Sequence, residues 1–154
     1  ILDQSHIMDL VHFLLGDFEG VVSFNGNLSN LEVKSDDFSE LLIKLKSGVI
    51  ASVHTDMFGR DHKKLLEIKG EKGNLIWDHY KNSVILYCAQ TSKYKVYDNF
   101  SEDFNLNYIE ELKHFMNCCI KGENCISPLE DGIKTMKLIE AAKKSNKSGI
   151  YQIV

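Results

Sequence analysis

The fold is decided by the stretch Asp3-Gln4-Ser5-His6-Ile7-Met8-Asp9-Leu10-Val11-His12-Phe13-Leu14-Leu15-Gly16. Its apolar residues follow the i, i+3, i+4, i+7 spacing of one helix face, and they are Ile7, Leu10, Val11 and Leu14. Asp3 or Ser5 can cap the start of this helix, and Gly16 stands where a left-handed residue commonly ends one. The stretch therefore predicts an amphipathic helix with a start, a buried face and a stop.

Polar side chains gather in the first turns of this helix. Asp3, His6 and Asp9 follow one another at intervals of three residues. The helix macrodipole disfavours an imidazolium near the N-terminus, whereas a neighbouring carboxylate favours it, so the histidine can exchange a proton near neutral pH. The group is a candidate acid/base site. The alternative is that Asp3 caps the helix while His6 and Asp9 form a solvated polar face.

Length and composition set the broad class. The chain has 154 residues, of which 44% are hydrophobic and 26% charged, as expected for one globular domain. The net charge of −4 argues against nonspecific binding to nucleic acid or to an anionic membrane. No apolar run approaches the roughly 18 residues of a membrane span, and no signal-peptide pattern opens the chain. We expect a cytoplasmic protein.

The middle of the chain reads as short strands. Around Ser47-Gly48, alternating apolar residues on both sides indicate a β-hairpin. Gly70 and Gly73 stand between two expected strands, so they indicate another hairpin turn rather than a phosphate-binding loop, and no G-x-G-x-x-G motif occurs. The short connections favour an antiparallel meander. The expected strands lie within residues 19–28, 41–45, 49–57, 64–68, 74–78, 83–88 and 93–97, with a last strand at 150–154.

Two more amphipathic helices are expected near the end of the chain. One covers residues 108–120, with Asn107 as its cap and Gly122 as its stop. The other begins at Ser127-Pro128-Leu129-Glu130, where a hydroxyl cap precedes a proline and a glutamate. Three helices on one face of a mostly antiparallel open sheet make an α+β architecture.

The other face of the expected sheet carries many apolar side chains. Its expected members are Leu42, Ile50, His54, Ile76, Ile85 and Tyr87. This face is too apolar to be wholly solvated, so we expect it to pair with another copy of the chain. The alternative is a set of scattered exposed apolar residues, which are common on protein surfaces.

The cysteines offer only a weak signal for a metal. His114 and Cys118 are four residues apart and could share an ion with Cys125, but no second pair of ligands supports that site. Buried, reduced thiols are the better explanation for Cys88, Cys118, Cys119 and Cys125. We expect no metal and no disulfide.

Several ordered motifs together resemble a known family. They are Leu2-Asp3-Gln4-Ser5-His6-Ile7-Met8-Asp9, Leu14-Leu15-Gly16, Arg60, Gly70-Glu71-Lys72-Gly73-Asn74-Leu75-Ile76-Trp77-Asp78, Tyr108-Ile109-Glu110-Glu111-Leu112-Lys113-His114-Phe115 and Leu129-Glu130-Asp131-Gly132. In type, order and spacing they resemble the C-terminal domain of the glucose-fructose oxidoreductase, inositol dehydrogenase and rhizopine-catabolism (Gfo/Idh/MocA) family. One departure is that many members place the aspartate four residues before the histidine, whereas Asp3 precedes His6 by three.

The resemblance implies a function and a set of site residues. Residues 1–154 would form the substrate-binding and oligomerisation domain of an NAD(P)-dependent enzyme that acts on a sugar or nucleotide-sugar hydroxyl or ketone. NAD or NADP would be held mainly by an N-terminal Rossmann domain that this chain lacks, so the isolated domain is expected to be inactive. The implied catalytic residues are His6, Asp9 and Asp3, and the implied substrate-binding residues are Arg60, Lys64 and Gln4.

The implied partners are the sugar substrate and further copies of the chain, as a homodimer or homotetramer. A guanidinium such as that of Arg60 can hold a phosphate or carboxylate at two points, although a surface arginine is often only solvated. The competing hypothesis is a non-enzymatic module of the same fold that serves in dimerisation or sugar sensing.

Overall fold

The structure is a computed structural model, which describes residues 1–98, 100, 103 and 105–154. The chain divides into two compact units, Ile1–Gly59 with Asn124–Val154, and Arg60–Glu123. Each unit contains one four-stranded antiparallel sheet, which confirms the predicted α+β class. The strands that were expected to form one meander are thus shared between two sheets. The segment 57–64 explains the division, because its glycine and its run of charged residues interrupt the apolar alternation of a strand.

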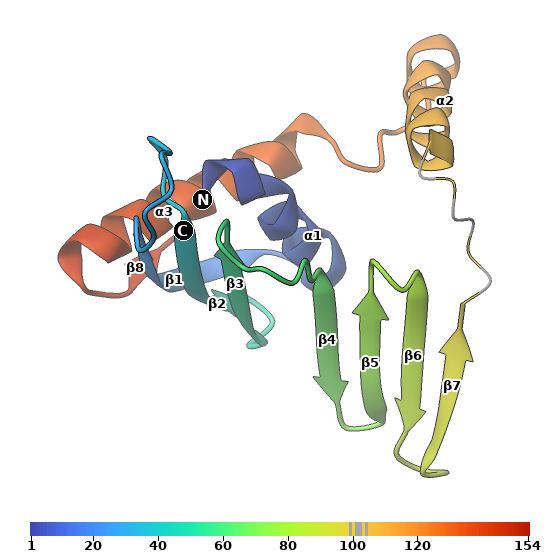
Figure 1. Ribbon diagram of the computed structural model, residues 1–154. Coiled ribbons are helices and arrows are strands. Elements are labelled where there is room, and N and C mark those ends of the chain that lie inside the picture. The colour runs from blue at the N-terminus through green and yellow to red at the C-terminus, as the bar shows by residue number, and fades with distance from the viewer. Residues whose placement is uncertain (99, 101–102, 104) are drawn as a thin grey trace. The chain divides into compact units, whose positions relative to one another are not determined.

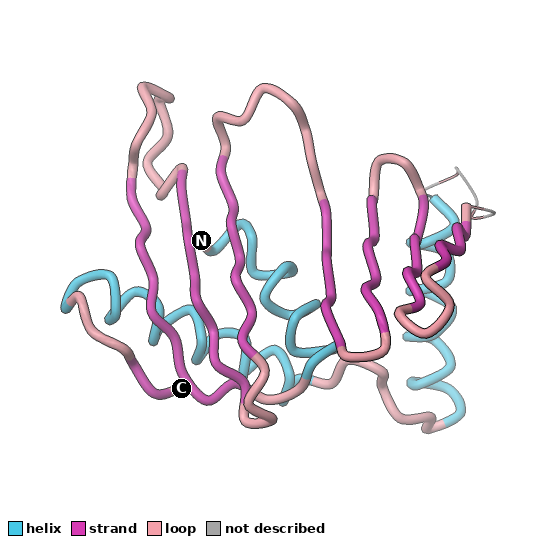
Figure 2. Tube along the Cα trace, turned by 90° about the horizontal axis from the view of Figure 1, so that it is seen from below, coloured by secondary structure: helices cyan, strands magenta, loops and turns pink. Residues whose placement is uncertain are grey.

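The first unit is a sheet covered by two helices. Its strands run in the order β3-β2-β1-β8, and α1 and α3 lie on the same side of them (Figures 1 and 2). The elements are a short 3₁₀ helix at Leu2–Gln4, α1 at Ser5–Leu15, β1 at Phe18–Gly26, β2 at Phe38–Leu45, β3 at Ile50–Asp56, α3 at Leu129–Ser148 and β8 at Gln152–Ile153.

Buried and exposed side chains alternate along the central strand β2 of the first unit, as expected for a strand with one covered face. In β2, Leu41, Ile43 and Leu45 have no exposed surface, whereas Leu42 between them is 53% exposed. The side chains of α3 that meet this face include Leu138, which is also fully buried. Burial of one such side chain contributes about 1.5–3 kcal/mol, so this alternation determines which face of the sheet the helices cover. The predicted division of Leu41 and Leu42 between opposite faces is confirmed.

The buried face of α1 differs from the predicted one. Met8, Val11 and His12 are buried, whereas Leu14 is 44% exposed. The apolar spacing misplaced this face because it excluded the histidine. His12 can be buried because its ring Nε2 lies 3.1 Å from Oδ1 of Asp17, which satisfies the polar atom.

The predicted side-chain caps are also wrong. Gln4, the last residue of the 3₁₀ helix, occupies the cap position of α1 and makes no side-chain cap bond, so neither Asp3 nor Ser5 serves there. The 3₁₀ turn supplies a backbone bond instead, from the Gln4 N–H to the Ile1 carbonyl at 3.2 Å. The stop at Gly16 is confirmed, because its N–H donates to the carbonyl of His12, although its φ of +94° and ψ of −164° differ from the expected left-handed conformation.

The start of α3 is shifted in the same way. Pro128 stands at its cap position in an extended conformation, without a side-chain cap bond, and the helix begins at Leu129. The hydroxyl of Ser127 therefore does not cap it.

The second unit is a four-stranded meander and a helix. Its sheet order is β4-β5-β6-β7, formed by Leu65–Gly70, Gly73–Asp78, Ser83–Cys88 and Lys93–Tyr97, and α2 spans Asn105–Lys121. The predicted turn between Gly70 and Gly73 is confirmed. A Cβ at Gly73 would overlap the carbonyl oxygen of Tyr87 on the neighbouring strand, so only glycine fits this position.

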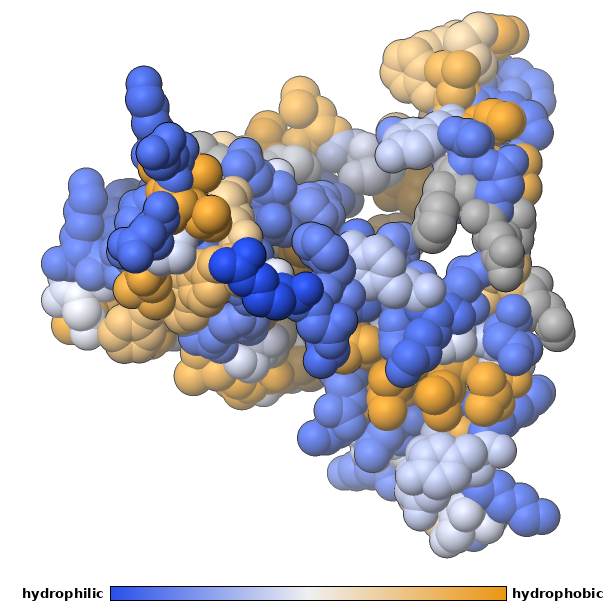
Figure 3. Space-filling model, in the orientation of Figure 1, coloured by the Kyte–Doolittle hydropathy of each residue, from blue (hydrophilic) through white to orange (hydrophobic). Residues whose placement is uncertain are grey.

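The helix α2 has no buried residue. The apolar side that was expected to pack on the sheet remains exposed, and Figure 3 shows hydrophobic surface over this helix. Its exposed apolar members include Ile109, Leu112, Phe115 and Met116, at 45%, 61%, 58% and 46%. Among the described residues, only α1 and α3 are helices that bury a face. None of the described helices combines the length and the apolar character needed to cross a membrane.

Candidate functional site

A pocket of about 400 Å³ opens in the first unit where the start of α1 meets the start of α3. We call it the α1–α3 pocket, and its lining residues are Ser5, His6, Asp9, Ser127, Pro128, Leu129, Gly132, Thr135 and Met136. The volume lies within the range of about 300–1,000 Å³ that is usual for small-molecule sites. Polar side chains come from both helices, while leucine, proline and methionine add apolar surface.

Helix geometry explains why these residues face one space. His6 and Asp9 are three residues apart on α1, so they lie on the same side of that helix. On α3, Gly132 is followed by Thr135 and Met136 at i+3 and i+4, which places them on one side as well. The two lined faces meet at the pocket. The predicted association of His6 with Asp9 on one helix face is therefore present.

The carboxylate of Asp9 is fixed by a hydrogen bond from the opposite helix. Its Oδ1 accepts a hydrogen bond of 3.2 Å from Oγ1 of Thr135, which is only 4% exposed. His6 is exposed, so its ring is open to a ligand that enters the pocket. An exposed imidazole beside an oriented carboxylate can accept a proton from a hydroxyl group and bind a second hydroxyl.

The other residues expected at the site lie elsewhere. Asp3 belongs to the 3₁₀ turn, is exposed and does not line the pocket, and Gln4 does not line it either. Arg60 and Lys64 belong to the second unit. The ammonium of Lys64 lies 5.8 Å from the ring centroid of Trp77, in a cation–π arrangement. The roles of these four residues stay predictions.

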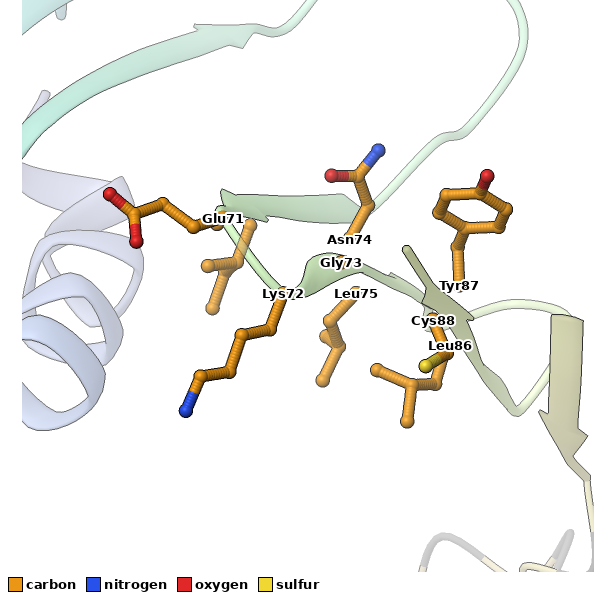
Figure 4. Close-up of a pocket in the computed structure, with 10 residues that line it drawn as sticks. Glu71, Lys72, Gly73, Asn74, Leu75, Leu86, Tyr87 and Cys88 are labelled. Carbon is orange, nitrogen blue, oxygen red and sulfur yellow. The ribbon is translucent and has the colours of Figure 1, made fainter. Parts of the chain in front are cut away.

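A larger hollow lies in the second unit, whereas His6 and Asp9 belong to the first. Its volume is about 560 Å³, and it is formed by the β4–β5 turn and by β6. Figure 4 shows Lys72, Leu75 and Leu86 on one side of the strands and Asn74 and Tyr87 on the other. Its lining contains polar residues, among them Glu71, Lys72 and Cys88, but none of the residues predicted for the site, whereas the α1–α3 pocket contains His6 and Asp9. The α1–α3 pocket is therefore the candidate site.

A charged cluster that the sequence did not predict ties the far end of α1 to α3. Nζ of Lys134 lies 2.9 Å from Oδ1 of Asp17, and the same carboxylate oxygen contacts the ring of His12. Lys134 first, and His12 second, hold the pKa of Asp17 far below its usual range. In return, Asp17 raises the pKa of Lys134. Because Lys134 precedes Thr135, the cluster fixes α3 next to the pocket.

Acid should weaken this cluster. A carboxyl whose pKa is lowered by folding adds stability above its unfolded pKa of about 3.9, and that stability is lost as pH falls through the folded value. The stability difference between the wild type and Asp17→Asn should therefore be largest near neutral pH and shrink progressively below about pH 5. Denaturant unfolding at a series of pH values measures it. Parallel pH profiles for the two proteins would contradict the assignment.

The sequence of this chain is similar to those of known oxidoreductases. The sequence profile described as "Oxidoreductase family, C-terminal alpha/beta domain" matches residues 1–152. Myo-inositol 2-dehydrogenase of Thermotoga maritima is 26% identical over 151 residues, which cover 91% of this chain and 44% of that protein.

Solved structures share the fold. A levoglucosan dehydrogenase in complex with NADH and levoglucosan has a TM-score of 0.86 at 16% identity, covering 97% of this chain and 48% of its own. The WlbA dehydrogenase from Bordetella pertussis, in complex with NADH and UDP-GlcNAcA, has a TM-score of 0.74 at 17% identity, with coverages of 99% and 46%. The chain thus spans about half the length of the relatives it matches.

Proposed function

This chain belongs to the Gfo/Idh/MocA oxidoreductase family as its C-terminal alpha/beta domain, and from that premise we propose that it is the substrate-binding part of a nicotinamide-dependent dehydrogenase. The substrate is a sugar or a nucleotide sugar, oxidised at a hydroxyl or reduced at a ketone. The relatives bound to NADH, levoglucosan and UDP-GlcNAcA support this class of substrate. The observation that carries the proposal is the placement of His6 and Asp9 on one wall of the α1–α3 pocket.

The described residues fit the substrate side of such a site rather than the cofactor side. The sequence has no glycine-rich G-x-G-x-x-G turn to hold a pyrophosphate, so we assign NAD or NADP mainly to an N-terminal domain. When bound, the nicotinamide supplies the hydride chemistry. The residues of this chain bind the sugar, orient it and move the proton.

Each wall of the pocket has a role in this proposal. His6 accepts the proton of the reacting hydroxyl when the sugar is oxidised and returns it in the reverse direction. Asp9 accepts a hydrogen bond from a neighbouring hydroxyl. The hydroxyls of Ser5 and Ser127 can both donate and accept, which suits a polyol. Met136 offers an apolar surface to the C–H face of the sugar ring.

A direct assay tests the proposal. The full-length enzyme is incubated with NAD or NADP and a panel of free and nucleotide-linked sugars, and the reduced cofactor is followed by its absorbance. We expect turnover with at least one sugar substrate. Turnover confined to a substrate without a carbinol or carbonyl carbon would contradict the assigned chemistry.

We also propose that the chain pairs with a second copy through the open face of the first sheet, the side of β1–β3 that α1 and α3 do not cover. Three large apolar side chains are exposed there, namely Phe24, Leu42 and Ile50, at 66%, 53% and 56%. Beside them, His54 lies 2.8 Å from Glu40 and 3.0 Å from Asp56, and these carboxylates, Glu40 first, raise the pKa of His54. An exposed apolar patch beside charged residues is typical of a protein–protein interface. In the second sheet, Ile76 and Ile85 pair across β5 and β6 and stay predicted members of such an interface.

A charge on the open face should weaken self-association. Leu42→Lys places an ammonium at the centre of this face, where burial against a second copy costs desolvation energy. Sedimentation velocity should then show a shift toward the monomer, whereas Leu28→Lys, a change at a 67% exposed loop residue, should leave the oligomer intact. A wild-type protein that stays monomeric at high micromolar concentration would contradict self-association through this face. A specific contact commonly buries about 800 Å² per partner.

A further inference from the structure

Thr135 is a buried polar residue in the interior of α3. Its side chain is 4% exposed, and its Oγ1 donates a hydrogen bond of 3.2 Å to Asp9, a residue 126 positions earlier in the chain. Threonine is a weaker helix former than alanine, and inside a helix its hydroxyl often bonds to a carbonyl of the preceding turn. Here the hydroxyl instead spans from one helix to the other. The bond therefore joins the two walls of the α1–α3 pocket.

The bond leaves half of the carboxylate available. Thr135 contacts Oδ1 of Asp9, and within the described part of the chain the carboxylate has no other hydrogen-bond donor. Asp9 is only partly buried and lines the pocket, so Oδ2 remains accessible to a ligand. A carboxylate held at one oxygen loses rotational freedom before the ligand arrives, which lowers the entropy cost of binding.

The neighbouring residue keeps this geometry in place. Lys134 pairs with Asp17 at 2.9 Å and with Asp131 at 3.3 Å, so α3 is fixed to the segment that follows α1. Asp17 in turn contacts His12, which is buried on α1. The two helices are thus linked by charged contacts immediately before Thr135.

We propose that Thr135 is a positioning residue, which orients Asp9 so that its second oxygen binds a substrate hydroxyl in the α1–α3 pocket. The proposal rests on the proposed function of this pocket. Thr135 itself need not touch the substrate. Its hydroxyl acts through Asp9.

Two substitutions separate the hydroxyl from the packing. Thr135→Val keeps the shape of the side chain and removes the donor, whereas Thr135→Ser keeps the donor and removes the methyl group. In steady-state assays of the full-length enzyme with its sugar substrate, Thr135→Val should lower kcat/KM about five- to tenfold, which corresponds to the net contribution of one typical hydrogen bond. Thr135→Ser should stay within about twofold of the wild type. Thermal unfolding of both variants shows whether the fold is retained.

A double-mutant cycle tests whether Thr135 acts through Asp9. In an Asp9→Ala background the carboxylate is gone, so adding Thr135→Val should cause no further loss of kcat/KM. A residue that only packs would instead reduce activity by the same factor in both backgrounds, and that result would overturn the inference. Equal losses for Thr135→Ser and Thr135→Val would overturn it too.

The activity of Asp9→Ala distinguishes a failure of the role proposed for Thr135 from a failure of the function proposed for the pocket. If Asp9→Ala is impaired while Thr135→Val is fully active, the inference about Thr135 fails alone. If Asp9→Ala is itself fully active, the function proposed for the pocket fails and the inference fails with it.

Discussion

Replacement of His6 by alanine is expected to lower kcat of the full-length enzyme about 10²- to 10⁴-fold, the usual contribution of a positioned general base. In the proposed reaction a sugar hydroxyl loses its proton as the hydride leaves, and the exposed ring of His6 opens onto the α1–α3 pocket. Affinity for the cofactor should change little, because we assign the cofactor to another domain. Steady-state kinetics at saturating cofactor over a range of pH measure the effect, and one limb of the pH profile should disappear.

The control for His6→Ala lies on the same helix. Leu14 is 44% exposed and does not line the pocket, so Leu14→Ala should keep nearly full activity and reports any general effect of altering α1. Asp9→Asn should reduce activity less than His6→Ala, since its part is to bind or orient. A rise in KM with kcat spared would make His6 a substrate hydrogen-bond donor only. Unchanged kcat and kcat/KM would refute both roles.

The fold could be predicted where local patterns decide it. The alternation around Leu41 and Ile43 predicted a strand with one buried face, and the structure buries both residues completely. The face of α1 could not be predicted in the same way. His12 is buried there because Asp17 and Lys134 satisfy or surround its ring, and Lys134 is distant in sequence. No local periodicity contains that information.

The candidate site shows the same division between local and distant information. His6 and Asp9 could be placed together because their spacing is set by one helix. The opposite wall, with Ser127 and Thr135, could not be anticipated, because it is brought to α1 only by the packing of α3. Asp3 was expected to join them, but it belongs to the 3₁₀ turn before α1, is exposed and does not line the pocket.

A larger side chain at Gly132 should fill the α1–α3 pocket without disturbing the helices that form its walls. This glycine lies inside α3, has no need of a positive φ, and a Cβ placed on it would meet no atom within 4 Å. A glycine in a helix interior costs about 1 kcal/mol relative to good helix formers. Gly132→Leu should therefore retain or raise the melting temperature, while its side chain extends from a wall of the α1–α3 pocket into the space for the substrate.

A Gly132→Leu variant that is at least as stable as the wild type but less active would identify Gly132 as the residue that keeps the pocket open. We expect Gly132→Leu to lower kcat/KM by about 10- to 100-fold, mainly through KM, because the sugar must be displaced from its position beside His6. Gly132→Ala is the matched control, since it gains the same helix stability with a much smaller side chain and should lose only a few-fold. Thermal unfolding and steady-state kinetics on the same preparations make the comparison. Full activity of Gly132→Leu at unchanged KM would place the substrate outside this pocket, because a leucine side chain and a sugar ring cannot share the space next to α3.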